Sequence, residues 1–181
     1  MGDIVLLSDE QLVIAVREKN KQRYAELVKR YQEKLMRYAT YLIHDFQKAQ
    51  DIVQESFIKA YINLYGFNTK QKFSSWIYRI VHNEAMNAVK KYYKEMPLGE
   101  ESTYISKEDM EDELSKKEIV EQAQGCLQKV PVLYREVLAL YYLDEKSYTD
   151  ISDILHIPMG TVATRINRAK GVMKKICQEN Q

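Results

Sequence analysis

The sequence predicts an all-α protein made of two small helical domains, an N-terminal helical bundle and a C-terminal helix-turn-helix, joined by a flexible acidic linker. Glycine and proline are scarce, with 6 and 3 residues in 181, which argues against a turn-rich β protein. Apolar residues make up 45% of the chain and recur at helical spacing. Charge is segregated, because basic segments at 70–94 and 156–175 flank an acidic one at 95–113. We therefore expect domains at 1–94 and 114–181, with 95–113 as the linker.

The N-terminal domain is expected to begin with helices over residues 9–43, capped by Ser8 or Asp9. Another helix is expected over 47–64, with its apolar residues turned toward the core. Three polar residues of this helix share its outward face: Asp51, Gln54 and Glu55. Such a face is either ordinary solvated surface or a docking site for another protein.

The basic segment that follows predicts contacts to nucleic acid. A polar loop over 66–72 leads into a helix from Ser74 or Ser75 to about residue 91. Four polar side chains form one stripe of this helix, opposite its apolar stripe: Arg79, Asn83, Asn87 and Lys90. Asparagine is a mediocre helix former. Two asparagines on one stripe therefore indicate a functional role for this face rather than ordinary solvent-exposed surface. Such side chains donate to phosphates and to base edges. Trp76 either stacks on a base or, as is more common, anchors the core.

The acidic segment after this helix lacks sustained helical periodicity. Its like charges repel, so we expect an extended linker. An alternative role is to shield the basic helices, since opposite charges attract over about a Debye length of 8–10 Å. Helical spacing resumes near Leu114 and continues to Leu127, and Pro131 opens another helix.

The last part of the chain, from Ser147 to Lys175, has the pattern of a helix-turn-helix. Ser147 is a good N-cap for a short helix, and Pro158 ends that helix and suits the start of the next. The second helix has an apolar stripe and a basic remainder, with no acid before Glu179. This pattern is typical of a helix that enters the DNA major groove, although ordinary helical hairpins also carry basic faces. Four residues of this helix are candidates for DNA contacts, three on its outward side and the last at the border of the apolar stripe: Thr161, Thr164, Arg168 and Arg165.

No pattern in the sequence indicates catalysis or a cofactor. Paired carboxylates, a phosphate-binding loop and a cluster of metal ligands are all missing, so we expect no catalytic residues, no metal site and no small-molecule substrate. Cys126 and Cys177 are far apart along the chain, and we expect both to be reduced. No apolar run approaches the roughly 18 residues of a membrane span, and no secretion signal is visible. We expect a cytoplasmic protein without direct membrane insertion.

Four segments together resemble those of the bacterial extracytoplasmic-function sigma factors, small specificity subunits of RNA polymerase in the sigma-70 family. They are DIVQESFIKAY (51–61), FSSWIYRIVHNEAMNAVKK (73–91), VPVLYREVLALYYLDEKSYTDISDIL (130–155) and PMGTVATRINRAK (158–170). The chain departs from the family pattern at Asn87 and Lys90, where Asp and Arg are frequent, and at Ala163, where Lys or Arg is common. These departures imply a different base preference.

The resemblance implies a protein that binds core RNA polymerase and promoter DNA, serves a stress response, and is held by an anti-sigma factor; we expect the free protein to be a monomer. It implies that the face formed by Asp51, Gln54 and Glu55 docks on a coiled coil of the largest polymerase subunit. The C-terminal candidates are assigned to the −35 element. The −10 element is assigned to the basic loop and the polar stripe: Asn68, Lys70, Lys72, Arg79, Asn83, Asn87 and Lys90.

Two other classes of protein remain as alternatives. One is a helix-turn-helix transcriptional regulator that is not a polymerase subunit, which would leave the basic, asparagine-bearing helix without a role. The other is a nucleic-acid enzyme, which the sequence does not support.

Overall fold

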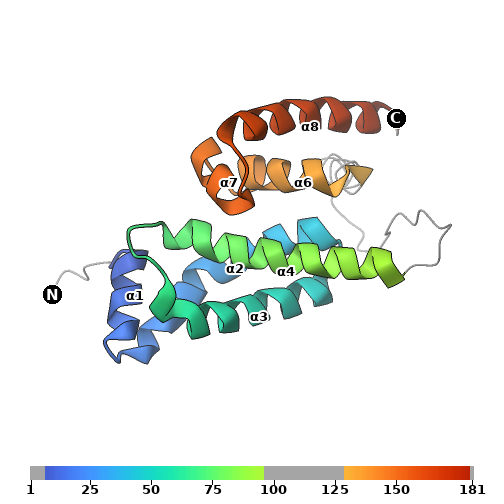
Figure 1. The fold of residues 1–181 in the computed structure, drawn as a ribbon. Helices are drawn as coiled ribbons and strands as arrows, with labels where there is room; N and C mark the ends of the chain where they lie inside the picture. Colours follow the sequence, from blue (N-terminus) through green and yellow to red (C-terminus); the bar gives the residue numbers. More distant parts are fainter. Residues whose placement is uncertain (1–6, 96–128, 180–181) are drawn as a thin grey trace, which may run out of the picture.

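The structure is a computed structural model that describes residues 7–95 and 129–179, and within these residues all regular structure is helical (Figure 1). The N-terminal group of helices comprises α1 (Asp9–Arg17), η1 (Lys21–Arg23), α2 (Tyr24–Ile43), α3 (Phe46–Asn63), η2 (Leu64–Gly66) and α4 (Phe73–Glu95). The C-terminal group comprises α6 (Val132–Leu138), the π-helical turn η3 (Ala139–Leu143), α7 (Tyr148–Leu155) and α8 (Met159–Glu179). The predicted all-α class is confirmed. The linker after residue 95 and the helix expected over 114–127 lie outside the described residues.

Local capping signals begin two of the N-terminal helices. Ser8 accepts a hydrogen bond from the Gln11 backbone N–H, and the Gln11 side chain accepts one from the Ser8 backbone N–H, which together form a capping box at α1. Asp45 caps α3 by accepting from the Lys48 backbone N–H at 3.0 Å. Between these caps, α2 ends at His44 in a left-handed conformation with φ 56°. These short links fold the helices back on one another.

The apolar stripes of these helices meet in a close-packed core. Its fully buried aromatic and leucine side chains include Tyr38, Tyr78, Phe73, Leu12, Leu27 and Leu35. Burying one such side chain contributes roughly 1.5–3 kcal/mol, so the core rather than helix propensity holds α1–α4 together.

The beginning of α4 differs from the prediction. We expected Ser74 or Ser75 as the N-cap, but the helix begins at Phe73 and Ser75 is buried in its first turn. The Phe73 backbone N–H instead donates to the carboxylate of Glu10 in α1, at 3.1 Å. The prediction was wrong because this acceptor comes from 63 residues away, where no local signal shows it.

The C-terminal group contains the predicted helix-turn-helix. Ser147 caps α7 by accepting from the Asp150 backbone N–H at 3.1 Å. The first helix ends at His156, which is left-handed with φ 53°, and Pro158 directly precedes α8. The apolar stripe of α8 is turned inward, with Val162 and Ile166 fully buried.

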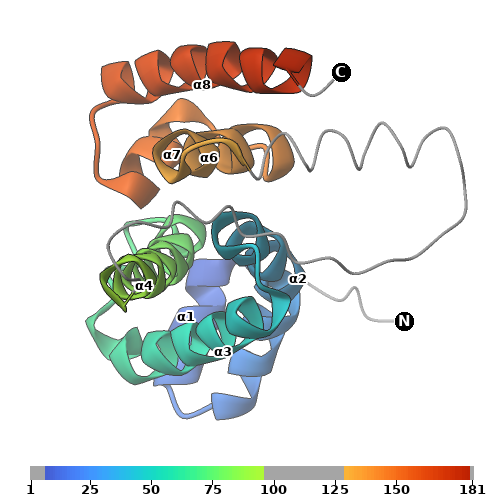
Figure 2. The same cartoon turned by 90° about the vertical axis from the view of Figure 1, so that its right-hand side faces the viewer.

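The two groups pack against each other. α6 and α7 lie along α2 and α4, whereas α8 lies on the far side of α6, away from the N-terminal helices (Figures 1 and 2). The buried residues of both groups belong to one hydrophobic cluster. One side of α4 is therefore covered by α7, and the outward side of α8 is open.

Two further expectations concern cysteines and membranes. Cys177 in α8 is disulfide-bonded, so the expectation that it is reduced is wrong; spacing along the chain does not show which sulfur atoms the fold brings together. Cys126 lies outside the described residues. Among the described helices, none has both the length and the apolar character that crossing a bilayer requires.

We expect Glu10→Ala to lower the free energy of unfolding by about 0.5–2 kcal/mol, the usual loss for a helix cap. Glu10→Gln keeps an acceptor oxygen and is expected to retain most of the stability. Urea unfolding of the two variants checks this. Equal losses would contradict a role as hydrogen-bond acceptor for Phe73.

Candidate nucleic-acid interface

The polar stripe predicted on α4 lies on its surface. Asn83, Asn87 and Lys90 are exposed along one side of the helix, while Ile77 and Val81 are fully buried on the other. A row of hydrogen-bond donors along a helix is suited to phosphates and base edges.

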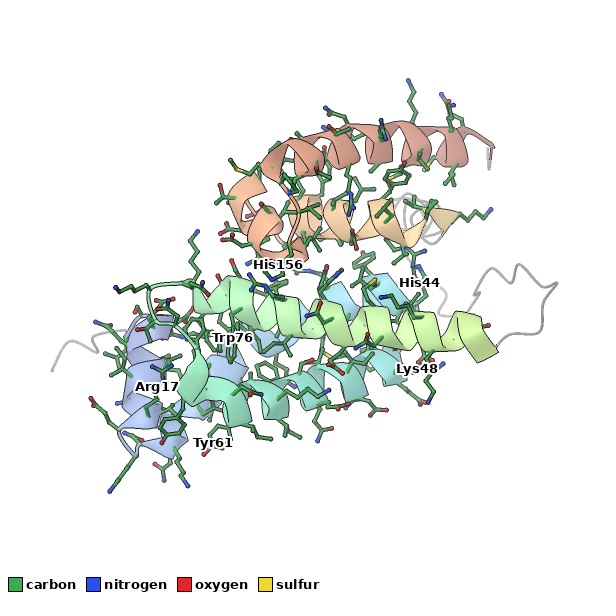
Figure 3. The ribbon with its side chains drawn as sticks, viewed as in Figure 1. Arg17, His44, Lys48, Tyr61, Trp76 and His156 are labelled. Atoms are coloured by element: carbon green, nitrogen blue, oxygen red, sulfur yellow. The ribbon has the colours of Figure 1, made fainter. Side chains whose placement is uncertain are left out.

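The loop before α4 continues this surface. Asn68 and Lys70 are exposed, and the Asn68 side chain accepts a hydrogen bond from the Lys70 backbone N–H at 3.0 Å, which forms an Asx turn. Arg17 of α1 fixes the start of the loop by donating to the carbonyl oxygens of Leu64 and Phe67 (Figure 3). Sequence reasoning missed Arg17, because nothing near it in the chain indicates its partners.

Two of the residues predicted to contact DNA are instead held by α7. Lys72 Nζ lies 2.7 Å from Asp150 Oδ1, and Arg79 Nε donates to the Asp153 carbonyl oxygen at 3.0 Å. The hydrogen bond to Asp150 raises the pKa of Lys72 above its ordinary value. Burial would raise the pKa of Asp150, but Lys72 and Ser147 lower it below its ordinary value. Both groups of this pair are therefore charged at neutral pH.

The four candidates on α8 divide into outward and inward residues. Thr164 and Arg168 are exposed, and Thr161 is half-buried. The Thr164 hydroxyl donates to the Gly160 carbonyl oxygen at 2.8 Å. Arg165 points toward α6, where it donates to Glu136 Oε1 at 2.7 Å.

Glu136 is the centre of a buried polar cluster between the two groups. Its side chain is 7% exposed, and its second oxygen lies 3.8 Å from His82 Nε2 in α4. The other ring nitrogen of His82 lies 3.0 Å from the Tyr38 hydroxyl in α2. The cluster thus links α8 to α6, α4 and α2. Sequence reasoning missed it; the available signal was a pair of charges, Arg135 and Glu136, inside an otherwise apolar helix.

Burial sets the charge states of this cluster. It raises the pKa of Glu136 to about 7, against the lowering effect of Arg165. Burial and, to a lesser extent, the positive charges of Arg165 and Lys90 together lower the pKa of His82 to about 4. His82 is therefore neutral at pH 7, and its contact with Glu136 is not an ion pair.

The acidic face predicted on α3 is also open. Asp51, Gln54 and Glu55 are exposed, and the same side of the helix continues into Ile58 and Ile62, which are 53% and 68% exposed. Exposed apolar residues beside charged ones are typical of a protein-binding surface. Sequence reasoning did not include Ile62.

Trp76 behaves as a core anchor. It is half-buried at the N-terminal end of α4 (Figure 3), with its ring centroid 4.8 Å from that of Phe67 and 5.7 Å from that of Phe73. The Trp76 ring therefore packs against other aromatic side chains of the N-terminal group. No cluster of three potential metal ligands occurs among the residues that the structure describes.

Comparison with known proteins identifies the family. The sigma-70 region 2 family matches residues 27–95, and the sigma-70 region 4 family matches residues 120–172. The chain is 33% identical over 171 residues to the ECF RNA polymerase sigma factor SigW of Bacillus subtilis, covering 88% of this chain and 91% of SigW. It is 33% identical over 181 residues to the RNA polymerase sigma-H factor of Pseudomonas aeruginosa, covering 94% of each. The chain belongs to the extracytoplasmic-function sigma factors of the sigma-70 family.

Solved structures share the fold. CnrH in complex with the cytosolic domain of CnrY matches with a TM-score of 0.74 at 20% identity, covering 96% of this chain and 99% of CnrH. RpoE of Bartonella quintana in complex with the anti-sigma factor NepR matches with a TM-score of 0.69 at 20% identity, covering 87% and 98%. Family membership therefore identifies the chain as a sigma factor rather than as a transcriptional regulator that is not a polymerase subunit.

The buried cluster predicts opposing effects of pH on stability. The stabilisation from Glu136, whose pKa is raised from 4.5 to about 7, is present below pH 4.5 and is lost as the pH rises toward 7. The stabilisation from His82, whose pKa is lowered from 6.5 to about 4, is present above pH 6.5 and is lost as the pH falls toward 4. The two effects oppose each other between these limits.

Single variants are expected to separate the two effects. Relative to the unaltered protein, His82→Gln should gain stability as the pH falls from 6.5 to 4. Glu136→Gln should lose relative stability as the pH falls from 7 to 4.5. Urea unfolding across this range measures both, and parallel curves for the three proteins would contradict the assignment.

Proposed function

We propose that this protein binds core RNA polymerase and directs initiation at promoters with −10 and −35 elements, without catalytic activity of its own. The observation that carries the proposal is the pair of donor-rich helix surfaces on α4 and α8, which belong to separate helical groups. Sigma-family membership supports it. We place the protein in the cytoplasm, where polymerase and promoters are found, as a monomer when free.

The spacing of the two family matches supports a division into domains. They cover 27–95 and 120–172 and leave the acidic segment between them. We propose a sigma region 2 domain at 1–94, a linker at 95–113 and a sigma region 4 domain at 114–181.

The −10 element is proposed to bind the loop before α4 and the stripe along it. Asparagine and basic side chains there suit unstacked bases and the backbone of one strand. Opening a duplex costs a few kcal/mol, which contacts to flipped bases offset. The residues are Asn68, Lys70, Lys72, Arg79, Asn83, Asn87 and Lys90.

The −35 element is proposed to bind the outward side of α8. Arg168 and Thr164 are exposed there, and Thr161 lies at the start of the helix, where side chains reach base edges. We propose that Arg165 contacts a phosphate of the DNA backbone. To reach it, Arg165 would give up its hydrogen bond to Glu136.

Polymerase is proposed to dock on α3, through Asp51, Gln54 and Glu55. Ile58 and Ile62 extend this face with exposed apolar side chains. Protein interfaces commonly combine an apolar centre with a polar rim, and this face offers both. The polymerase element implied by family resemblance is a coiled coil of its largest subunit.

An anti-sigma factor is a further proposed partner. RpoE of Bartonella quintana, which shares the fold, was solved in complex with the anti-sigma factor NepR. A partner of this kind would cover surfaces that otherwise meet polymerase or DNA.

The proposed function is tested by run-off transcription with bacterial core polymerase, in which we expect promoter-dependent transcripts only when this protein is added. Asp51→Lys combined with Glu55→Lys should weaken core binding at least tenfold, because it reverses the charge of the docking face. Pull-down and circular dichroism check binding and helicity.

The matched control for this test is Glu18→Lys combined with Glu33→Lys, which reverses two exposed acids elsewhere on the N-terminal group. It should bind core polymerase normally. Core binding that is unchanged by reversal at Asp51 and Glu55 would refute the docking assignment.

Asn83→Ala is expected to reduce open-complex formation far more than closed-complex binding, because the amide is proposed to contact bases only after the strands separate. Permanganate footprinting reports strand opening, and mobility-shift assays report closed-complex binding. Asn63→Ala, at an exposed asparagine on α3, is the control. Equal effects on both steps would indicate mere phosphate anchoring by Asn83.

A further inference from the structure

The segment that joins α3 to α4 is attached to α1 at both of its ends. At its start, the Arg17 guanidinium donates to the Leu64 carbonyl oxygen, at 3.0 Å from Nε and 2.6 Å from Nη2. At its end, the Phe73 backbone N–H donates to the Glu10 carboxylate at 3.1 Å. α1 lies at the same end of the N-terminal group as this segment (Figure 1). Because Glu10 and Arg17 belong to one helix, that helix sets the distance between the two points of attachment.

Arg17 also holds the peptide group that leads into Asn68. Its Nη2 donates to the Phe67 carbonyl oxygen as well as to that of Leu64, so one side chain holds two carbonyl groups of the segment. A peptide unit is planar, and the Phe67 carbonyl lies in one plane with the backbone nitrogen of Asn68. Holding this oxygen therefore sets the direction in which the chain enters Asn68.

Packing of the Phe67 side chain supports the same residue from the side of α4. Phe67 is 5% exposed, and its ring centroid lies 4.8 Å from that of Trp76 and 5.8 Å from that of Phe73. A hydrogen bond in the opposite direction adds to the contact with α1, because the Tyr65 hydroxyl donates to the Arg17 carbonyl oxygen at 3.2 Å. Phe67 is thus held through its carbonyl by α1 and through its ring by α4.

A tight turn begins at Asn68. Its side chain accepts a hydrogen bond from the Lys70 backbone N–H at 3.0 Å, and its carbonyl oxygen accepts one from the Gln71 backbone N–H at 2.9 Å. Asn68 and Lys70 are both exposed. The direction of this turn relative to α4 is therefore set where it joins Phe67, at the peptide group that Arg17 holds.

We propose that Arg17 is a positioning residue for −10 recognition, which aims Asn68 at the DNA strand without contacting DNA itself. The inference rests on the proposed function of the loop. It requires the shape of arginine as well as its charge, because Nε and Nη2 form a fork that reaches two carbonyl oxygens at once. Lysine, with a single side-chain nitrogen, would keep the charge but lose the fork.

The packing of α1 on the core does not depend on the Arg17 guanidinium. Leu12 and Val13 of the same helix are fully buried, and Val16 is 4% exposed. Burial of each such side chain contributes roughly 1.5–3 kcal/mol. We therefore expect the variant Arg17→Lys to fold, with its loosening confined to the loop.

Hydrogen exchange in the free, full-length protein tests the hold on the loop. We expect backbone amides of residues 68–72 to exchange roughly threefold faster or more in Arg17→Lys than in the unaltered protein, since local opening sets the exchange rate. Amides in the middle of α2 should be unaffected. Mass spectrometry of peptides that span the two segments measures both rates.

The matched control is Arg23→Lys, the same substitution at an exposed arginine of the N-terminal group, which should leave exchange in the loop unchanged. Exchange in the loop that is equally slow in Arg17→Lys and in the unaltered protein would overturn the proposal.

A double-mutant cycle tests whether Arg17 acts through Asn68. With core polymerase bound, Arg17→Lys and Asn68→Ala should each slow open-complex formation roughly threefold to tenfold. When Asn68 is already alanine, the further effect of Arg17→Lys should shrink to less than about twofold, because residues that act as one unit are not additive. Permanganate footprinting over time measures the rates.

Asn87→Ala provides the comparison for this cycle. Asn87 is exposed about four turns along α4 from Phe73, so Arg17→Lys should keep its full effect in that background.

Two results of the cycle would overturn the proposal. One is an Arg17→Lys effect that is as large with Asn68→Ala as without it, and the other is a loop that exchanges faster while open-complex formation is unchanged. If the unaltered protein gives no promoter-dependent transcripts, the proposed function fails and the positioning role fails with it. Hydrogen exchange would still show in that case whether Arg17 holds the loop, so the two failures can be told apart.

Discussion

The burial of two consecutive ionisable side chains, Arg135 and Glu136, is the constraint on which the arrangement of the two helical groups depends. A buried polar or charged group is costly unless it is hydrogen-bonded, so each of the two needs a partner at a defined position. Arg135 finds the carbonyl end of α2, and Glu136 finds Arg165 of α8. Because both partners belong to rigid helices, these bonds set the orientation of α6 relative to α2 and α8. The position of the helix-turn-helix depends on that orientation.

The helices themselves could be predicted from the sequence because their signals are local. Ser8 and Ser147 cap the helices that follow them, and Pro158 precedes α8. The start of α4 could not be predicted, since its first N–H is satisfied by Glu10 across the fold. Local patterns thus predict where helices form and where the locally capped ones begin, whereas a tertiary partner decides where α4 begins.

The same distinction applies to the candidate site. Helical periodicity alone placed Asn83 and Asn87 on one exposed side of α4, because a regular helix converts spacing directly into direction. It could not show that Lys72 meets Asp150, which is 78 residues away, or that Arg165 turns inward to Glu136. Long basic side chains reach whichever acceptor the fold brings near, so their partners depend on packing.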